Sequence, residues 1–114
     1  MIKRNNIQTD TNNNFIGCWV LNKKICEKII KFYEDNLGDV KQGEAGSKVN
    51  KDVKLSEDIS ILPKDLKDEK YKVMVDYMRL LKECYVDYLE QWPNLKNLFT
   101  TVECSAFNIQ KYYP

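Results

Sequence analysis

Apolar residues recur at two different spacings along this chain, and these spacings predict strands alternating with helices. Residues 15–21, F-I-G-C-W-V-L, form a nearly continuous apolar run of strand length, which favours a buried strand. Gly17 inside this run indicates a bulge or a close backbone approach. Residues 53–62 alternate between apolar and polar and predict either a second strand with a break at Glu57-Asp58 or an extended segment, which ends at Pro63.

Residues 23–37 have apolar side chains spaced by three and four, as on one face of a helix. Asn22 fits the N-cap position, because its side chain can accept from the free amides of the first turn. Gly38 fits the cap position after the helix. The predicted apolar face consists of Ile25, Cys26, Ile29, Ile30, Phe32 and Tyr33.

Residues 66–92 show the same helical spacing over a longer stretch and predict a long amphipathic helix that ends at Pro93. We expect this helix to bury Leu81, Tyr85 and Leu89 against the sheet. The sequence thus predicts that Leu81→Ala costs about 2–5 kcal/mol of stability.

Residues 102–114, V-E-C-S-A-F-N-I-Q-K-Y-Y-P, have the composition of a closing strand. Neither of its two faces is cleanly apolar, which is typical of a strand that lines a polar space or lies at the margin of a sheet. One face carries Phe107, Ile109, Lys111 and Tyr113, and the other carries Ala106, Asn108, Gln110 and Tyr112.

The order of elements predicts an α+β fold in which two main helices pack on a small β-sheet that is either complete or lacks further strands. Residues 1–14 are a polar, Asn-rich arm that Ile2 and Ile7 could anchor as a short edge strand, and residues 15–114 form a single domain. Residues 39–52 form a long Gly-containing loop, either functional or a plain connection.

Charge and composition exclude several classes of partner. The 114 residues carry a net charge of +1, from 18 basic and 17 acidic side chains, so we expect no nucleic-acid partner. No apolar run approaches the ~20 residues of a membrane span, and no signal peptide is visible at the start, so we expect no membrane partner.

The four cysteines also bear on the compartment. Cys18, Cys26, Cys84 and Cys104 have apolar neighbours and are predicted to be small buried hydrophobic residues. Free thiols fit a reducing cytoplasm, and two disulfides are the alternative.

The sequence contains no histidine, which restricts its chemistry. Histidine is the usual general base near neutral pH and the commonest metal ligand, so we assign no catalytic and no metal-binding residue. Glu57-Asp58 is an acidic pair within an apolar segment, and adjacent residues on a strand point to opposite faces. The G-E-A-G of residues 43–46 lacks the Lys and Ser/Thr of a phosphate-binding loop.

The closing segment F-N-I-Q-K-Y-Y-P, residues 107–114, resembles the strand before the iron motif in Fe(II)/2-oxoglutarate-dependent dioxygenases of the prolyl 4-hydroxylase type. In that family a strand ending in Tyr-Pro runs into a Gly-containing turn, and the next strand carries the His-x-Asp iron ligands. The order of elements upstream resembles the family's N-terminal support layer, in which helices brace a double-stranded β-helix. Residues 54–56, K-L-S, resemble an Arg-x-Ser element of some relatives, with Lys in place of Arg.

This resemblance implies that the chain is the N-terminal part of a larger 2-oxoglutarate/Fe(II)-dependent dioxygenase-like protein, truncated before the iron motif. Tyr113 corresponds to the tyrosine that contacts 2-oxoglutarate in the family. Fe(II) and 2-oxoglutarate are implied only for a longer parent protein, in which they would serve iron-dependent hydroxylation. The chain by itself is expected to bind no cofactor and to turn over no substrate.

Two other functions stay open at this point. The chain could be a small self-contained α+β interaction protein that binds through residues 39–52 or an open sheet edge. It could also be an enzyme of another class that uses Cys, Lys or paired carboxylates. If the resemblance holds, residues 102–114 lack a strand partner on at least one side, which predicts self-association through this strand.

Overall fold

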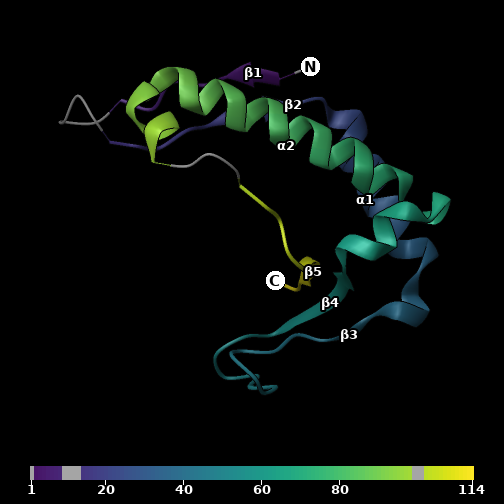
Figure 1. Ribbon diagram of the computed structural model, residues 1–114. Coiled ribbons are helices and arrows are strands. Elements are labelled where there is room, and N and C mark those ends of the chain that lie inside the picture. The colour runs from purple at the N-terminus through teal and green to yellow at the C-terminus, as the bar shows by residue number, and fades with distance from the viewer. Residues whose placement is uncertain (1, 9–13, 99–101) are drawn as a thin grey trace.

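The computed structural model describes residues 2–8, 14–98 and 102–114 (Figure 1). It confirms the predicted α+β class, with two α-helices and two small antiparallel sheets among the described residues. One sheet pairs β1 with β2, and the other has the strand order β3-β4-β5. The elements are β1 (Ile2–Arg4), β2 (Trp19–Leu21), α1 (Lys23–Asp35), β3 (Lys41–Gln42), β4 (Ser56–Ile61), α2 (Lys72–Gln91) and β5 (Phe107–Tyr112), with short 3-10 turns η1 (Leu37–Asp39), η2 (Pro63–Lys67), η3 (Glu69–Tyr71) and η4 (Pro93–Asn97).

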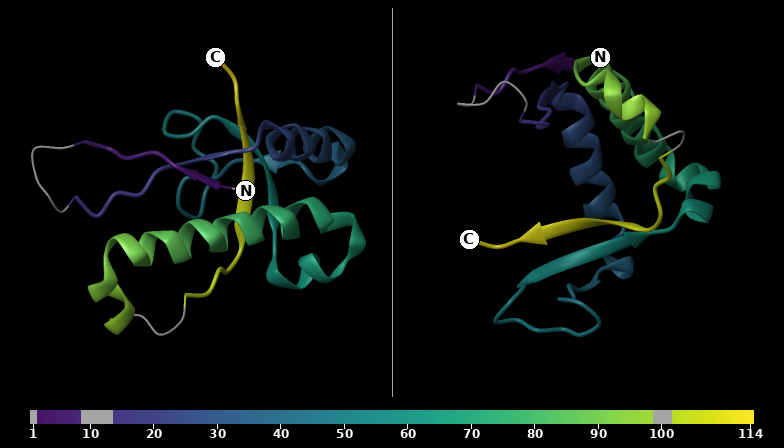
Figure 2. Two further views of the ribbon diagram at one scale, coloured as in Figure 1. Left: turned by 90° about the horizontal axis from the view of Figure 1, so that it is seen from above. Right: turned by 60° about the vertical axis from the view of Figure 1, so that its left-hand side comes forward.

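The elements form an open crescent with two arms. In Figures 1 and 2, α2 with β1 and β2 forms one arm, the three-stranded sheet forms the other, and α1 runs between them. β5 lies on the inner side of the sheet arm. The radius of gyration is 16.6 Å, whereas a compact domain of this length has about 13 Å. The large value agrees with an extended arrangement of two arms.

The core lies where the two arms meet. Ile59 and Ile61 of β4 are 1% and 0% exposed, and they pack in one cluster with Phe32, Tyr33 and Met74. Phe107 and Ile109 of β5 are half-buried against the same cluster. Burying an aliphatic side chain of this size contributes roughly 1.5–3 kcal/mol, so this cluster holds the arms together.

α1 begins as predicted. The Asn22 side chain accepts a hydrogen bond from the Lys24 amide at 2.9 Å, and Ile25 is among the buried residues of the helix. The predicted Gly38 cap is wrong, because Asn36 caps the helix and Gly38 lies in η1. The Asn36 side-chain amide donates to the Phe32 carbonyl at 2.7 Å and satisfies one of the terminal carbonyls.

The apolar face of α1 is wider than the surface that covers it. Ile30 is 58% exposed and Cys26 is also exposed, because the open crescent covers only part of the helix. The cysteines differ in the same way, since Cys84 is buried, Cys18 is half-buried and Cys104 is exposed. The prediction that all four are buried is wrong for three of them, and all four are free thiols.

β4 is continuous through Glu57 and Asp58, so the predicted break is wrong. The strand tolerates both carboxylates because they lie on opposite faces, and each has its own polar partner. The expected strand also begins later than predicted, since Val53 and Leu55 lie before β4 and are exposed.

α2 ends at Gln91, before Pro93, as predicted, but it begins only at Lys72 because η2 and η3 precede it. The predicted burial of Leu81 is wrong, since this side chain is 44% exposed. Tyr85 and Leu89 are half-buried, and the buried residues of α2 are Met74 and Cys84. The middle of α2 spans the open part of the crescent, where the sheet does not reach it (Figure 2).

The predicted buried strand at residues 15–21 is also wrong. Only Trp19–Leu21 is a strand, and Phe15, Ile16 and Val20 are each more than half exposed. β1 pairs with it antiparallel, so the N-terminal arm does contribute an edge strand through Ile2. A Cβ atom on Gly17 would lie 2.2 Å from the Trp19 ring, so the close approach at this glycine involves a side chain.

None of the helices in the described ranges is both long and apolar enough to cross a membrane.

Candidate functional site

β5 has one bonded edge and one open edge. The Gly43 amide donates to the Ser56 carbonyl at 2.8 Å, so the backbone groups of Ser56 and Asp58 point toward β3. The backbone groups of the alternate β4 residues, Glu57, Ile59 and Ile61, therefore point toward β5. They bond to the residues opposite them, which are Lys111, Ile109 and Phe107. The N–H and C=O groups of Asn108, Gln110 and Tyr112 point the other way, and no described residue pairs with them.

The open edge adjoins a cleft between α1 and β5. This cleft has a volume of about 340 Å³ and is lined by Ile29, Ile30, Tyr33 and Glu34 of α1 and by residues 109–112. An extended segment that approached the open edge would therefore also meet the apolar side chains of α1.

Tyr113 lies in a polar cluster on the helix-facing side of the sheet. Its hydroxyl donates to the Glu57 carboxylate at 3.2 Å, and the Tyr33 hydroxyl donates to the Glu57 backbone carbonyl at 3.1 Å. The Lys111 ammonium lies 5.0 Å from the Tyr113 ring centre and 5.8 Å from that of Tyr33. The cluster thus places one cation, one carboxylate and two phenols side by side.

Two of these groups have shifted pKa values. Burial, followed by the nearby Glu57 carboxylate, raises the pKa of Tyr33, so this phenol stays protonated. The interaction with Tyr113 raises the pKa of Lys111, so the ammonium stays charged. The cluster is therefore built for hydrogen bonding and charge recognition, and neither group is tuned to exchange a proton near pH 7.

The residues of this cluster do not fit an iron site. Non-haem iron of the family's type needs two histidines and a carboxylate, and the sequence has no histidine. The described residues also bring together no group of three His, Cys, Asp or Glu side chains. Tyr113 is half exposed and could meet a carboxylate of 2-oxoglutarate, but its donor is already directed at Glu57.

A second polar cluster lies on the opposite face of the same strands. Lys54 and Asp58 form an ion pair at 3.0 Å, with side chains 18% and 7% exposed. Gln110 lies 3.5 Å from the same carboxylate oxygen and accepts from the Tyr112 hydroxyl at 3.1 Å. Within the described part of the chain, the Ser56 hydroxyl and the second Asp58 oxygen are buried without a partner.

Gly43 allows the loop before β4 to lie directly on this second cluster. A Cβ atom at Gly43 would lie 2.1 Å from the Ser56 hydroxyl and 3.1 Å from the Asp58 carboxylate. The ion pair therefore fastens residues 43–54 to β4. Because Lys54 already neutralises Asp58, the cluster offers little to a metal cation.

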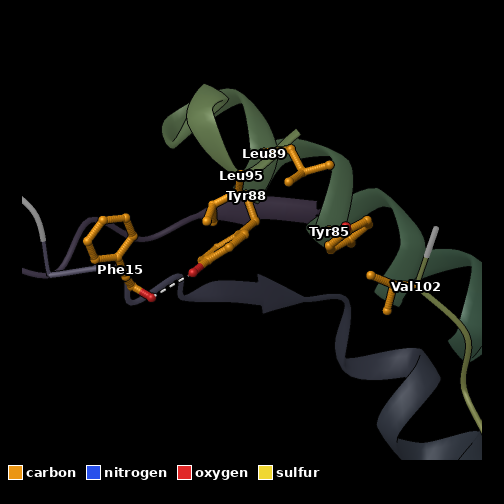
Figure 3. Close-up of a pocket in the computed structure, with 6 residues that line it drawn as sticks. All are labelled: Phe15, Tyr85, Tyr88, Leu89, Leu95 and Val102. Atoms are coloured by element: carbon orange, nitrogen blue, oxygen red, sulfur yellow. Dashed lines mark hydrogen bonds between the residues drawn. The ribbon is translucent and has the colours of Figure 1, made fainter. Parts of the chain in front are cut away.

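An aromatic hollow lies at the far end of the helix arm (Figure 3). It has a volume of about 310 Å³, and the Tyr88 hydroxyl in its wall donates to the Phe15 carbonyl at 2.9 Å. Trp92 packs beside both rings in tilted orientations, with ring centres 4.7 Å from Tyr88 and 5.8 Å from Phe15. The hollow is lined by Phe15, Tyr85, Tyr88, Leu89, Leu95 and Val102.

Phe15 has a backbone φ of 56°, a conformation that bulky residues seldom adopt. The sequence does not predict this hollow, because the apolar run at residues 15–21 favours a buried strand. The available signal was the spacing of Tyr85, Tyr88 and Trp92 by three and four on one side of α2.

An ionic contact joins this end of α2 to β1 and β2. Arg4 donates to Asp87 at 2.8 Å, and the Trp19 indole donates to the same carboxylate at 2.7 Å. The hydrogen bond from Arg4, followed by that from Trp19, lowers the pKa of Asp87 to about 2. The contact is structural, since both donors come from the N-terminal strands.

The structure brings only some of the sequence-predicted site residues together. Tyr113 meets Glu57, while Asp58 points away to the other face, as expected for adjacent residues on a strand. Lys54 and Ser56, from the K-L-S element, flank Asp58 in the second cluster. No protein-family model, no curated protein and no solved structure matches the chain.

Proposed function

We propose that this chain is the N-terminal, non-catalytic portion of a 2-oxoglutarate/Fe(II)-dependent dioxygenase-like protein. In this role it supplies a helical layer and the first strands of a larger sheet. One observation carries the proposal: β5, the strand with the family-like segment, is bonded to β4 on one edge and open on the other. A strand edge with unpaired backbone groups is a template for a further strand.

The packing of the helices supports this role. Phe32 of α1 and Met74 of α2 cover the same face of β4 through Ile59 and Ile61. Helices that cover one face of a sheet resemble the bracing layer of the family. The large radius of gyration agrees with a layer that packs against further structure.

The proposal assigns chemistry only to a longer parent. There, Tyr113 would leave Glu57 and donate its hydroxyl to a carboxylate of 2-oxoglutarate, while other segments would supply iron ligands. The donor set of the chain alone does not fit iron, because it contains no histidine. The proposal includes a cytoplasmic location, which four free cysteines support.

The second candidate is a self-contained interaction protein, and the aromatic hollow favours it. Phe15 and Val102 are 52% and 61% exposed at its rim, and exposed apolar hollows mark interaction sites. Self-association through residues 102–114 is compatible with both candidates, since it needs only the open edge.

The coding sequence downstream of codon 114 tests the first candidate. We expect it to continue in frame with a Gly-containing turn and then a strand bearing His-x-Asp. A stop codon directly after Pro114 would overturn the proposal and leave the interaction protein.

In the longer protein, Tyr113→Phe removes the donor to 2-oxoglutarate and should raise the KM for this cosubstrate about tenfold, whereas Tyr112→Phe, on the other face, should leave it unchanged. Equal effects of the two variants would contradict the role of Tyr113.

A further inference from the structure

We propose that β5 pairs antiparallel with β5 of a second copy of this chain, with Gln110 opposite Gln110 of the second copy. The inference rests on the open strand edge that also carries the proposed function. It names the occupant of that edge for the 114-residue chain by itself, and the register in which it binds; in a longer parent the next strand would compete for the same edge.

The chemistry of the edge requires an extended partner. Asn108, Gln110 and Tyr112 each direct one N–H and one C=O away from β4, which gives three donors and three acceptors in a row. β5 is six residues long, and Lys111 is its single charged side chain. Long edge strands with few charges pair readily with another strand.

The sequence of β5 selects one register for self-pairing. With Gln110 at the two-fold axis, Asn108 pairs with Tyr112 of the second copy, so all three outward-facing residues are bonded. A shift toward the C-terminus places Lys111 opposite Lys111 of the second copy, and like charges directly opposite are destabilising. A shift toward the N-terminus pairs Tyr112 with Ala106, which lies before β5.

The neighbouring helix provides a surface for the added strand. In the selected register, Lys111 lies opposite Ile109 of the second copy on the helix-facing side. The cleft between α1 and β5 borders this position, and Ile30 at its rim is 58% exposed. The added strand would therefore cover apolar side chains of α1 as well as the open backbone.

The expected dimer is weak. One strand seam buries less area than a typical stable interface, so the association should depend on concentration between the micromolar and near-millimolar ranges. It should also be reversible, because both copies keep their folded β4–β5 ladder.

Sedimentation velocity of the full chain over this concentration range tests the inference. We expect a dimer that grows with concentration and is lost in Gln110→Pro, since proline removes an outward-facing donor. Ile109→Pro is the matched control: its N–H bonds to β4, so this variant should lose stability, which circular dichroism would detect. A chain that stays monomeric throughout, or a Gln110→Pro variant that is folded and still dimeric, would overturn the inference.

Cross-linking tests the register without a proline. In a Cys26→Ser, Cys104→Ser background, Gln110→Cys should form a covalent dimer in oxidised glutathione, because paired Cα atoms lie about 5.5 Å apart. Asn108→Cys is the matched control, since it faces Tyr112 of the second copy, and it should cross-link several-fold more slowly. Equal rates would overturn the register.

These results are separable from the test of the proposed function. A monomeric chain would leave the downstream His-x-Asp prediction untouched. A stop codon after Pro114 would leave the dimer and its register untouched.

Discussion

The two halves of α2 are held in different ways. In the first half, Met74 is 2% exposed and packs with Ile59, Ile61 and Phe32. In the second half, Asp87 binds Arg4 and Trp19, and the Tyr88 and Trp92 rings meet Phe15. Burial in the core cluster therefore fixes one half, while the other half is fixed mainly by polar and aromatic contacts at a half-exposed surface, with Cys84 as its buried residue. The comparison shows that a uniform apolar period along a helix does not imply uniform burial.

The largest expected effect is the difference in unfolding free energy between truncating a buried and an exposed side chain of α2. Met74→Ala should cost about 2–5 kcal/mol of unfolding free energy, because it leaves a cavity in the core. Leu81→Ala, on the same helix but 44% exposed, should cost less than about 1 kcal/mol. Urea titrations of both variants measure the difference, and equal losses would show that the sheet covers the whole helix.

Gly43→Ala tests how tightly the loop lies on β4. The added Cβ would lie 2.1 Å from the Ser56 hydroxyl, so the loop must shift and the variant should lose about 1–3 kcal/mol. Gly38→Ala is the control, since its Cβ would meet nothing within 4 Å, and its effect should stay within about 0.5 kcal/mol. A neutral Gly43→Ala variant would show that the Lys54–Asp58 pair does not hold the loop closely.

The contact at Asp87 predicts a smaller, pH-dependent effect. Its pKa is lowered from 3.8 to about 2 in the folded chain, so ionised Asp87 stabilises the fold above about pH 4. This contribution is lost as the pH falls from about 4 to about 2. Asp87→Asn should therefore flatten the decline of the urea midpoint over this window. An unchanged decline in the variant would assign the acid sensitivity to other groups.

The sequence predicts the positions of helices and strands better than it predicts which apolar side chains are buried. Three predictions depend only on neighbouring backbone, and the structure confirms them. They are the helix start after Asn22, the strand within residues 107–113 and the helix end before Pro93. Leu81, Phe15 and Cys26 are as apolar as core residues, yet they are exposed because the arms of the crescent do not close over them. Which apolar residues are covered depends on tertiary arrangement, and periodicity does not carry that information.

The candidate site shows the same division. The alternation of β5 is readable from residues 107–113, whereas its place at the margin of a sheet is one of two alternatives that the pattern leaves open. The partner of Tyr113 is not readable, because Glu57 lies 56 residues away and meets it only through the β4–β5 register. The direction of the free N–H groups also depends on that register. For this reason a proline at Gln110 removes an outward-facing donor, whereas a proline at Ile109 removes a donor to β4.

Amide hydrogen exchange of β5 in dilute solution tests the central claim most directly, namely that one edge of this strand is bonded and the other is open. The account predicts an alternating pattern, in which the Ile109 and Lys111 amides are protected and those of Gln110 and Tyr112 exchange rapidly. Uniform protection of all four amides in the monomer would contradict it, because it would mean that both edges are already paired.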